Sequence, residues 1–282
     1  MKYILLALFL FVVIGAFAAS HSSSSPLPSG DAPSDKKHKG KKVLTYDDLL
    51  PQPDSLPASL SPQQPLADDN PMTVEVRGHS TNRKIQGIDV SHYQGTINWN
   101  KVAGSGEVSY VYIKATEGEK LVDATLRPNL FGARRAGLYV GVYHFFRPNV
   151  GVQQQFLNFT SNVNIREMDL IPIIDIEHLG RVSKSTFQAR LRQFLDKVER
   201  HFGVRPILYT SRDFYNKYLA GPFTNYKYMI ARYHEEVPEL CDNAPFVMWQ
   251  YTSKGRLPGI SHNVDRSCFM DDYTLNDILL KR

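Results

Sequence analysis

The sequence predicts an α/β fold in which parallel strands alternate with helices and close into a truncated barrel. Three observations support this prediction. Apolar, strand-like runs recur along residues 85–282, and the earlier ones are followed by stretches with helical periodicity. The run at residues 170–176 is continuously apolar, as in a strand buried on both faces of a parallel sheet. Beyond residue 219 the helical stretches stop, although three further strand-like runs follow.

The strand–helix units come first in the chain. The helical stretch at residues 185–202 carries apolar side chains at intervals of three and four, and Gly203 ends it. Alternation of strands and helices favours a parallel sheet with right-handed crossovers. In chain order we predict strands at residues 85–90, 110–115, 139–146, 170–177 and 206–210, and helices at residues 126–136, 153–163, 185–202 and 212–219.

The last part of the chain supplies three more strands, which we predict at residues 228–233, 246–251 and 264–270. The two intervening loops of 12 residues each contain prolines and glycines, so we do not expect crossover helices in them. Eight strands indicate a closed barrel, and a folded region of about 200 residues is short for a complete (β/α)₈ barrel. No glycine-rich phosphate-binding motif follows the first strand, which argues against nucleotide binding.

The N-terminal part differs in composition from the rest. Residues 1–18 have one lysine, an apolar stretch at 4–14 and an A-x-A site at 16–18, which predicts a signal peptide for export to the periplasm, the cell envelope or the medium. An uncleaved anchor is the alternative. Residues 19–84 are rich in serine, proline and lysine and predict a disordered tether. The predicted catalytic barrel is residues 85–282.

Charge and cysteine content restrict the class of partner and the compartment. The formal net charge is +5, which suits a polyanionic substrate, but the basic run at residues 36–42 has no interleaved aromatic residues. We therefore expect no nucleic-acid partner. Cys241 and Cys268 are the two cysteines, and in an oxidising compartment they predict one disulfide, with two buried thiols as the alternative.

Acidic residues end the predicted strands. Asp175 and Glu177 close the apolar run at positions i and i+2, so their side chains point the same way. The alternative is that the strand ends at Ile174 and both acids are solvated loop residues. Asp89 ends the first strand, and Asp265 lies near the start of the last one. An antiparallel last strand would bring Asp265 to the rim that the other acids share.

Aromatic residues follow the same strand ends, where rings beside carboxylates form the kind of cleft that binds sugars. Singly, each ring is more often part of a core than of a ligand site. Candidate substrate-binding residues are Tyr93, Tyr143, Tyr209, Tyr233, Trp249 and Tyr251, with Phe145 nearby.

Six short motifs occur in a fixed order along the predicted barrel: residues 87–91 (GIDVS), 113–118 (IKATEG), 141–145 (GVYHF), 175–177 (DIE), 249–251 (WQY) and 264–265 (VD). Together they resemble the lysozymes of glycoside hydrolase family 25. The resemblance implies an irregular TIM-like (β/α)₅(β)₃ barrel that cleaves the β-1,4 bond between N-acetylmuramic acid and N-acetylglucosamine in peptidoglycan glycan strands. It also implies that Glu177 is the general acid/base, that Asp175 is its partner, and that Asp89 and Asp265 are supporting acids.

The residues allow two mechanisms. A neighbouring carboxylate raises the pKa of an acid that must protonate a glycosidic oxygen, as Asp175 would for Glu177. Direct attack of Asp175 on C1 is one option, but both acids lie on one side of the sugar, which makes it awkward. We therefore favour attack by the substrate's acetamido oxygen with net retention, and inversion is the competitor. We expect no metal or other cofactor, since neither the H-x-x-x-H nor the H-E-x-x-H metal-binding motif occurs. We also expect a monomer. A chitinase-like glycosidase and an inactive wall-binding module are the alternative functions.

Overall fold

The computed structural model describes residues 73–76 and 79–281. The predicted signal peptide and most of the predicted tether lie outside the described residues. Strand β1 (Thr73–Val76) pairs antiparallel with β2 (His79–Val90), so residues 73–76 and 79–84 form strands instead of continuing the tether. The reason is the edge that β10 (Ile260–Met270) offers: its last residues pair with Thr81 and Asn82 of β2.

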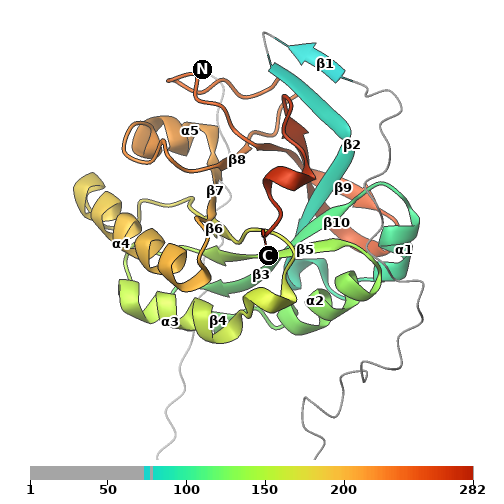
Figure 1. The fold of residues 1–282 in the computed structure, drawn as a ribbon, viewed down its shortest axis with the longest axis horizontal. Coiled ribbons are helices and arrows are strands. Elements are labelled where there is room, and N and C mark those ends of the chain that lie inside the picture. Colours follow the sequence, from blue (N-terminus) through green and yellow to red (C-terminus); the bar gives the residue numbers. More distant parts are fainter. Residues whose placement is uncertain (1–72, 77–78, 282) are drawn as a thin grey trace, which may run out of the picture. The chain divides into compact units, whose positions relative to one another are not determined.

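A closed barrel forms the centre of the fold, as the sequence predicts (Figure 1). The ring runs β2-β10-β9-β8-β7-β6-β5-β3 and closes where β3 pairs with β2, while β1 and β4 (Leu121–Val122) lie outside it. Each neighbouring pair in the series β2, β3, β5, β6, β7, β8 and β9 is parallel. Strand β10 is antiparallel to both of its neighbours, β2 and β9. The remaining bounds are β3 Tyr110–Glu117, β5 Tyr139–Phe145, β6 Ile173–Asp175, β7 Ile207–Ser211, β8 Tyr228–Ala231 and β9 Met248–Leu257.

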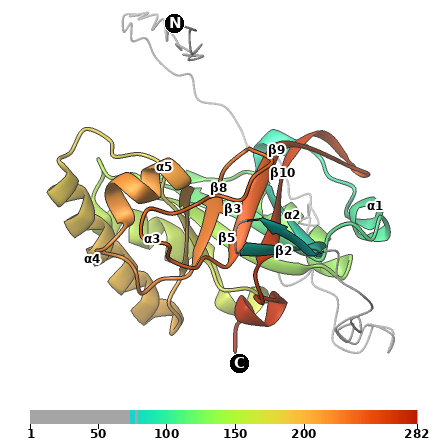
Figure 2. The ribbon, with the colours of Figure 1, turned by 90° about the horizontal axis from the view of Figure 1, so that it is seen from above.

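Helices α2, α3 and α4 match the predicted ranges. The first helix, α1, was not predicted, and the predicted helix at residues 212–219 is the short α5 followed by a π-helical turn. The Ser183 side chain caps α4 by accepting from the N–H of Thr186, and the helix ends at Gly203 in the left-handed conformation (φ 70°). The six residues of α1 are too few to show helical periodicity. The bounds are α1 Trp99–Gly104, α2 Leu126–Arg135, α3 Val152–Asn162, α4 Lys184–Phe202 and α5 Arg212–Phe214, with a π-helical turn at Tyr215–Leu219. Helices α2, α3 and α4 lie on the outside of the strands (Figures 1 and 2).

The last two strands correct one expectation. Instead of a 12-residue loop at residues 252–263, β9 and β10 continue as a hairpin whose turn contains Gly259 (φ 94°). The strands extend past the barrel because they pair with each other as far as Leu257 and Ile260. The expected reversal of the last strand is confirmed.

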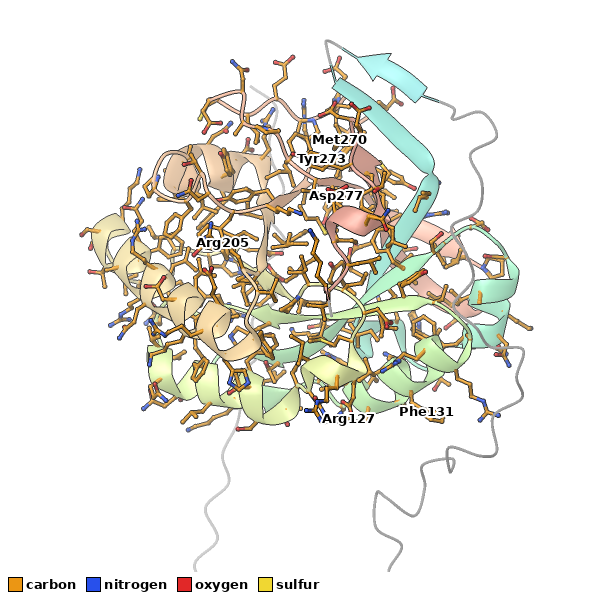
Figure 3. All side chains as sticks on the ribbon, viewed as in Figure 1. Arg127, Phe131, Arg205, Met270, Tyr273 and Asp277 are labelled. Carbon is orange, nitrogen blue, oxygen red and sulfur yellow. The ribbon has the colours of Figure 1, made fainter. Side chains whose placement is uncertain are left out.

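Two apolar clusters hold the barrel together. One lies between the strands and the helices, and the other is formed by the side chains that alternate to the opposite face, including Tyr110, Tyr112 and Ile173. Gly141 makes room for this second cluster, since a Cβ there would lie 2.4 Å from the ring of Tyr112. By contrast, Phe131 lies on the outer side of α2 and is 48% exposed (Figure 3).

Cys241 and Cys268 are not joined by a disulfide, so the expected pairing is wrong. Cys268 is buried in β10, whereas Cys241 is exposed in the loop between β8 and β9. Among the described residues, no helix is long and apolar enough to cross a membrane.

Candidate active site

The strand ends bring four carboxyl groups to one rim. Asp89 is the penultimate residue of β2, and Asp175 is the last residue of β6. Because β10 runs antiparallel to β2, Asp265 pairs in register with Asp89 and reaches the same rim from the other direction. The strand order therefore gathers the acids that the sequence predicts, although they are separated by up to 176 positions in the chain.

The backbone around Asp175 and Glu177 is fixed by the neighbouring strands. The N–H of Phe146 donates to the carbonyl of Asp175 at 2.9 Å, and the N–H of Ile176 donates to the carbonyl of Tyr209 at 2.9 Å. The Thr210 hydroxyl also donates to the carbonyl of Ile176 at 2.7 Å. These bonds continue the pairing of β6 as far as Ile176, so Glu177 directly follows a backbone segment that hydrogen bonds hold in place.

Asp175 is the most enclosed of the four acids. Its side chain is 7% exposed, and its Oδ1 atom has no hydrogen-bond partner within residues 73–76 and 79–281. Burial and the charge of Glu177 raise the pKa of Asp175 well above its usual value, and the Lys114 ammonium opposes that rise. A buried carboxyl oxygen without a partner is costly, and it is placed where a ligand could supply a donor.

Glu177 combines access to solvent with partial desolvation. Its side chain is exposed, yet the surrounding protein is close enough to raise the pKa of its carboxyl above the usual value. His178 and Arg147 lower that pKa, as does hydrogen bonding with Asp175. A reachable carboxyl with a raised pKa has the property that a general acid needs near neutral pH.

Asp89 and Asp265 form a second acidic pair. Burial, with a contribution from the charge of Asp265, raises the pKa of Asp89 to about 8. Burial and the charge of Glu177 raise the pKa of Asp265 to about 6. The two values differ enough that Asp265 loses its proton first as pH rises.

Gln250 links the acids to the aromatic residues, and the sequence analysis missed it. Its Nε2 donates to Oδ2 of Asp89 at 3.0 Å, and its Oε1 accepts from the hydroxyls of Tyr209 at 2.8 Å and Tyr233 at 2.9 Å. The side chain is 2% exposed. A polar residue between Trp249 and Tyr251, in the apolar run at residues 246–251, was the available signal.

The predicted aromatic residues divide into two groups. Tyr93 and Tyr233 expose 72% and 56% of their side chains, so their rings are available to a ligand. Tyr143 and Tyr209 are partly buried, and their pKa values are raised well above the usual range by burial and nearby carboxylates. Tyr251 packs against the apolar core and donates its hydroxyl to Gln86.

Trp249 corrects one site prediction. Its side chain is 0% exposed, and its indole N–H donates to the carbonyl of Arg232 at 3.0 Å. A ring without an exposed face cannot stack on a sugar, so Trp249 belongs to the core. It alternates with Gln250 along β9 and therefore points away from the barrel interior.

A charged cluster lies beside the acids and was also missed. Lys114 is only 7% exposed and donates to Glu117 at 2.6 Å, while the Nε of Arg147 donates to the same carboxylate at 2.9 Å. Both cations lie over the ring of Phe145. Because Lys114 and Arg147 lower the pKa of Glu177, the cluster limits how far that pKa rises.

The histidines of the barrel do not gather into a metal-ligand set. His144 is buried between Thr116 and Gln155, and burial lowers its pKa to about 4. In the part of the chain that the structure describes, no three His, Cys, Asp or Glu side chains come close enough to hold a metal ion.

An α/β barrel with paired carboxyls of raised pKa and exposed rings at one rim has the architecture of a glycoside hydrolase. The family model "Glycosyl hydrolases family 25" matches residues 88–260, and the chain belongs to this family. It is a glycoside hydrolase of the lysozyme type.

Similar proteins support the assignment. Lysozyme M1 of Streptomyces globisporus is 31% identical over 199 residues, which covers 66% of this chain and 67% of that protein. The uncharacterized protein YegX of Escherichia coli K12 is 36% identical over 189 residues, with 66% and 69% covered.

Among solved structures, the family 25 glycosyl hydrolase from Bacillus anthracis has a TM-score of 0.63 at 28% identity, covering 69% of this chain and 92% of that one. The Streptomyces coelicolor lysozyme has a TM-score of 0.61 at 30% identity, covering 69% and 94%. These likenesses agree with the predicted irregular TIM-like barrel.

Proposed function

We propose that this protein is an N-acetylmuramidase that cleaves the β-1,4 bond between N-acetylmuramic acid and N-acetylglucosamine in peptidoglycan. The observation that carries the proposal is the pair formed by Asp175 and Glu177, in which both carboxyls have raised pKa values and one oxygen of Asp175 has no partner. The family and the lysozymes among its relatives support peptidoglycan as the substrate class.

In the first step, Glu177 donates its proton to the glycosidic oxygen as the bond to C1 breaks. Asp175 accepts the N–H of the 2-acetamido group with its unpartnered Oδ1 and so directs the acetamido oxygen towards C1. The oxygen forms a bond to C1 as the leaving sugar departs with the proton from Glu177. In the second step, Glu177 takes a proton from water, which opens the cyclic intermediate with net retention.

The two acids need opposite protonation states, and their contact favours this. Two interacting carboxyls share one proton over a range of pH, because the first charge opposes the second. Glu177 is the solvent-accessible member and can be reprotonated after each turnover. Asp175 is enclosed next to Lys114, whose ammonium favours its ionised form. Burial favours the proton on Asp175 in the empty site, so we propose that the acetamido N–H, donated to Oδ1, stabilises the charge of Asp175 when substrate binds and leaves the proton on Glu177.

The exposed aromatic residues supply the sugar contacts in this proposal. The rings of Tyr93 and Tyr233 stack on pyranose faces, and Gln250 holds Tyr233 by its hydroxyl. Tyr143 and Tyr209 lie closer to the acids and shape the cleft floor. Asp89 supports the cleft through its hydrogen bond with Gln250, and Asp265 supports it through its charge.

We also propose that the protein is exported through residues 1–18, because its substrate lies outside the cytoplasmic membrane. The composition of that segment is the support. Export can be tested by fractionating cells that express the whole chain and comparing a variant that lacks residues 2–18.

The experiment that tests the function is the Glu177→Gln variant, with Glu199→Gln on the outer helix α4 as a matched control. Glutamine keeps the shape of the side chain and removes the proton, so hydrolysis should fall by at least about a thousandfold while glycan binding and folding persist. Mass spectrometry of muropeptides should find reducing N-acetylmuramic acid ends with the native protein and the control. Reducing N-acetylglucosamine ends, or full turnover by Glu177→Gln, would contradict the proposal.

A further inference from the structure

A groove outside the acidic rim remains unexplained by this mechanism. It lies where the start of α1, the end of α2 and the turn between β9 and β10 meet, and its volume is about 760 Å³. Residues 96–101, Gly132, Arg135 and residues 259–261 line it. The N–H of Asn98 donates to the carbonyl of Gly259 at 2.9 Å, which ties the first and third walls together.

The groove offers hydrogen-bond donors and positive charge. Lys101 and Arg135 are exposed, and neither forms an ion pair with a side chain of residues 85–281. No acidic side chain lines the groove. Two uncompensated cations on one concave surface favour a ligand with carboxylate or phosphate groups.

Trp99 gives the groove a rigid aromatic wall. The residue is 6% exposed, and its indole lines the groove. Gly132 packs against the ring so closely that a Cβ there would lie 2.3 Å from Cδ1 of Trp99. The ring is therefore held in place, and its indole can contact a ligand that lies in the groove.

Strand β10 connects the groove to the acidic rim over a short distance. Ser261 at the groove and Asp265 at the rim lie four residues apart on β10, which is at most about 13 Å along a strand. The 3-10 turn at His92–Gln94, which carries the exposed Tyr93, lies between them: the side-chain amide of Gln94 donates to the carbonyl of Asn263 at 3.0 Å. A ligand that continues from the cleft can thus reach the groove.

We infer that this groove binds the peptide stem of the peptidoglycan, with Lys101 and Arg135 contacting its carboxylates. The inference rests on the proposed function, since the stem is attached to the muramic acid that the cleft holds. A stem of four or five residues spans up to roughly 13–18 Å, which matches the separation along β10. Its small apolar side chains suit the apolar part of the lining, and its carboxylates and carbonyls suit the donors. The groove then makes the enzyme prefer glycan that carries peptides.

The test compares two substrates with the double variant Lys101→Gln/Arg135→Gln. One substrate is a muropeptide oligomer with its stems, and the other is the same glycan after an amidase has removed them. We expect the KM for the peptide-bearing substrate to rise on the order of tenfold, as for the loss of two exposed ion pairs, with kcat unchanged. The KM for the bare glycan should not change. Arg134→Gln, an exposed neighbour on α2 that does not line the groove, is the control and should leave both values unchanged.

A binding measurement separates this inference from the proposed function. The chain has two tryptophans, and Trp99 lines the groove while Trp249 is buried. The free stem tetrapeptide should change the tryptophan fluorescence of the native protein and of Glu177→Gln, but not that of the double variant. A KM change of equal size on both substrates, no change on either, or a response to polyglycerol phosphate in place of the peptide would overturn the inference. If no substrate is hydrolysed but the peptide still binds, the muramidase proposal fails and the groove assignment stands.

Discussion

Replacing Asp89 by asparagine should stabilise the protein at neutral pH. The pKa of Asp89 is raised from 3.8 to about 8, first by burial and then by the charge of Asp265. In the unfolded chain the carboxyl ionises near pH 4, whereas in the folded chain it keeps its proton up to about pH 8. The folded state therefore loses stability relative to the unfolded state as pH rises through this window. Asparagine has no charge to lose and can still accept the hydrogen bond from Gln250.

The size of the stability change follows from the difference between the pKa values of Asp89 in the unfolded and folded states. The penalty is absent below about pH 4 and grows by about 1.4 kcal/mol for each pH unit above it, which gives an upper limit of about 4 kcal/mol at pH 7. Local rearrangement of the folded protein would reduce this, so we expect about 2 kcal/mol. For a folded region of about 200 residues, that raises Tm by roughly 4–8 °C.

Thermal unfolding at pH 4 and pH 7 provides the check. The Asp89→Asn variant should melt with the native protein at pH 4 and well above it at pH 7. Asp196→Asn, an exposed residue of α4, is the control and should stay within about 0.5 kcal/mol at both pH values. An equal Tm difference at both pH values, or destabilisation at pH 7, would show that Asp89 does not hold its proton in the fold.

Two further predictions concern the acid pair and the cysteines. Asp175→Asn should slow hydrolysis by at least about a hundredfold, and proton NMR of the fresh product of the native enzyme should show the β-anomer first; an α-anomer would mean inversion. A thiol reagent should modify the exposed Cys241 in the folded, unreduced protein and the buried Cys268 only after unfolding. Failure of both to react even in denaturant would restore the disulfide that the structure contradicts.

The sequence was most informative where periodicity is long. The helix at Lys184–Phe202 has five turns of apolar spacing and a glycine at its end, and its predicted bounds differ by one residue. The six-residue α1 was missed because it is too short to show periodicity, and the extension of β2 to His79 was missed because it depends on a distant partner. For β2 that partner is β10, whose long pairing edge lies about 180 residues away in the chain.

The candidate site shows the same limit. A carboxyl at the end of an apolar strand is visible in sequence, so the four acids could be predicted together with their common rim. Trp249 was predicted to bind substrate but lies in the core, whereas Gln250 was not predicted as a site residue. The register of β9 decides whether the side chain of Trp249 or that of Gln250 faces the barrel interior, and a shift of one residue would exchange them. Aromatic type alone cannot reveal that choice.

The final prediction follows from this position. Gln250 is neutral, and its two ends differ: the nitrogen donates to Asp89 and the oxygen accepts from Tyr209 and Tyr233. Gln250→Glu keeps the size but replaces the donor with an oxygen, so Asp89 would face a carboxylate at about 3 Å. The pKa of Asp89 should rise further, and stability should fall more steeply with rising pH than in the native protein. We expect a loss of about 2–3 kcal/mol at pH 7 and much less at pH 4, measured by chemical denaturation at both pH values. The double variant Asp89→Asn/Gln250→Glu restores a donor opposite the new acid and should recover most of the loss; without that recovery, the contact between residues 89 and 250 would not be what Gln250 contributes.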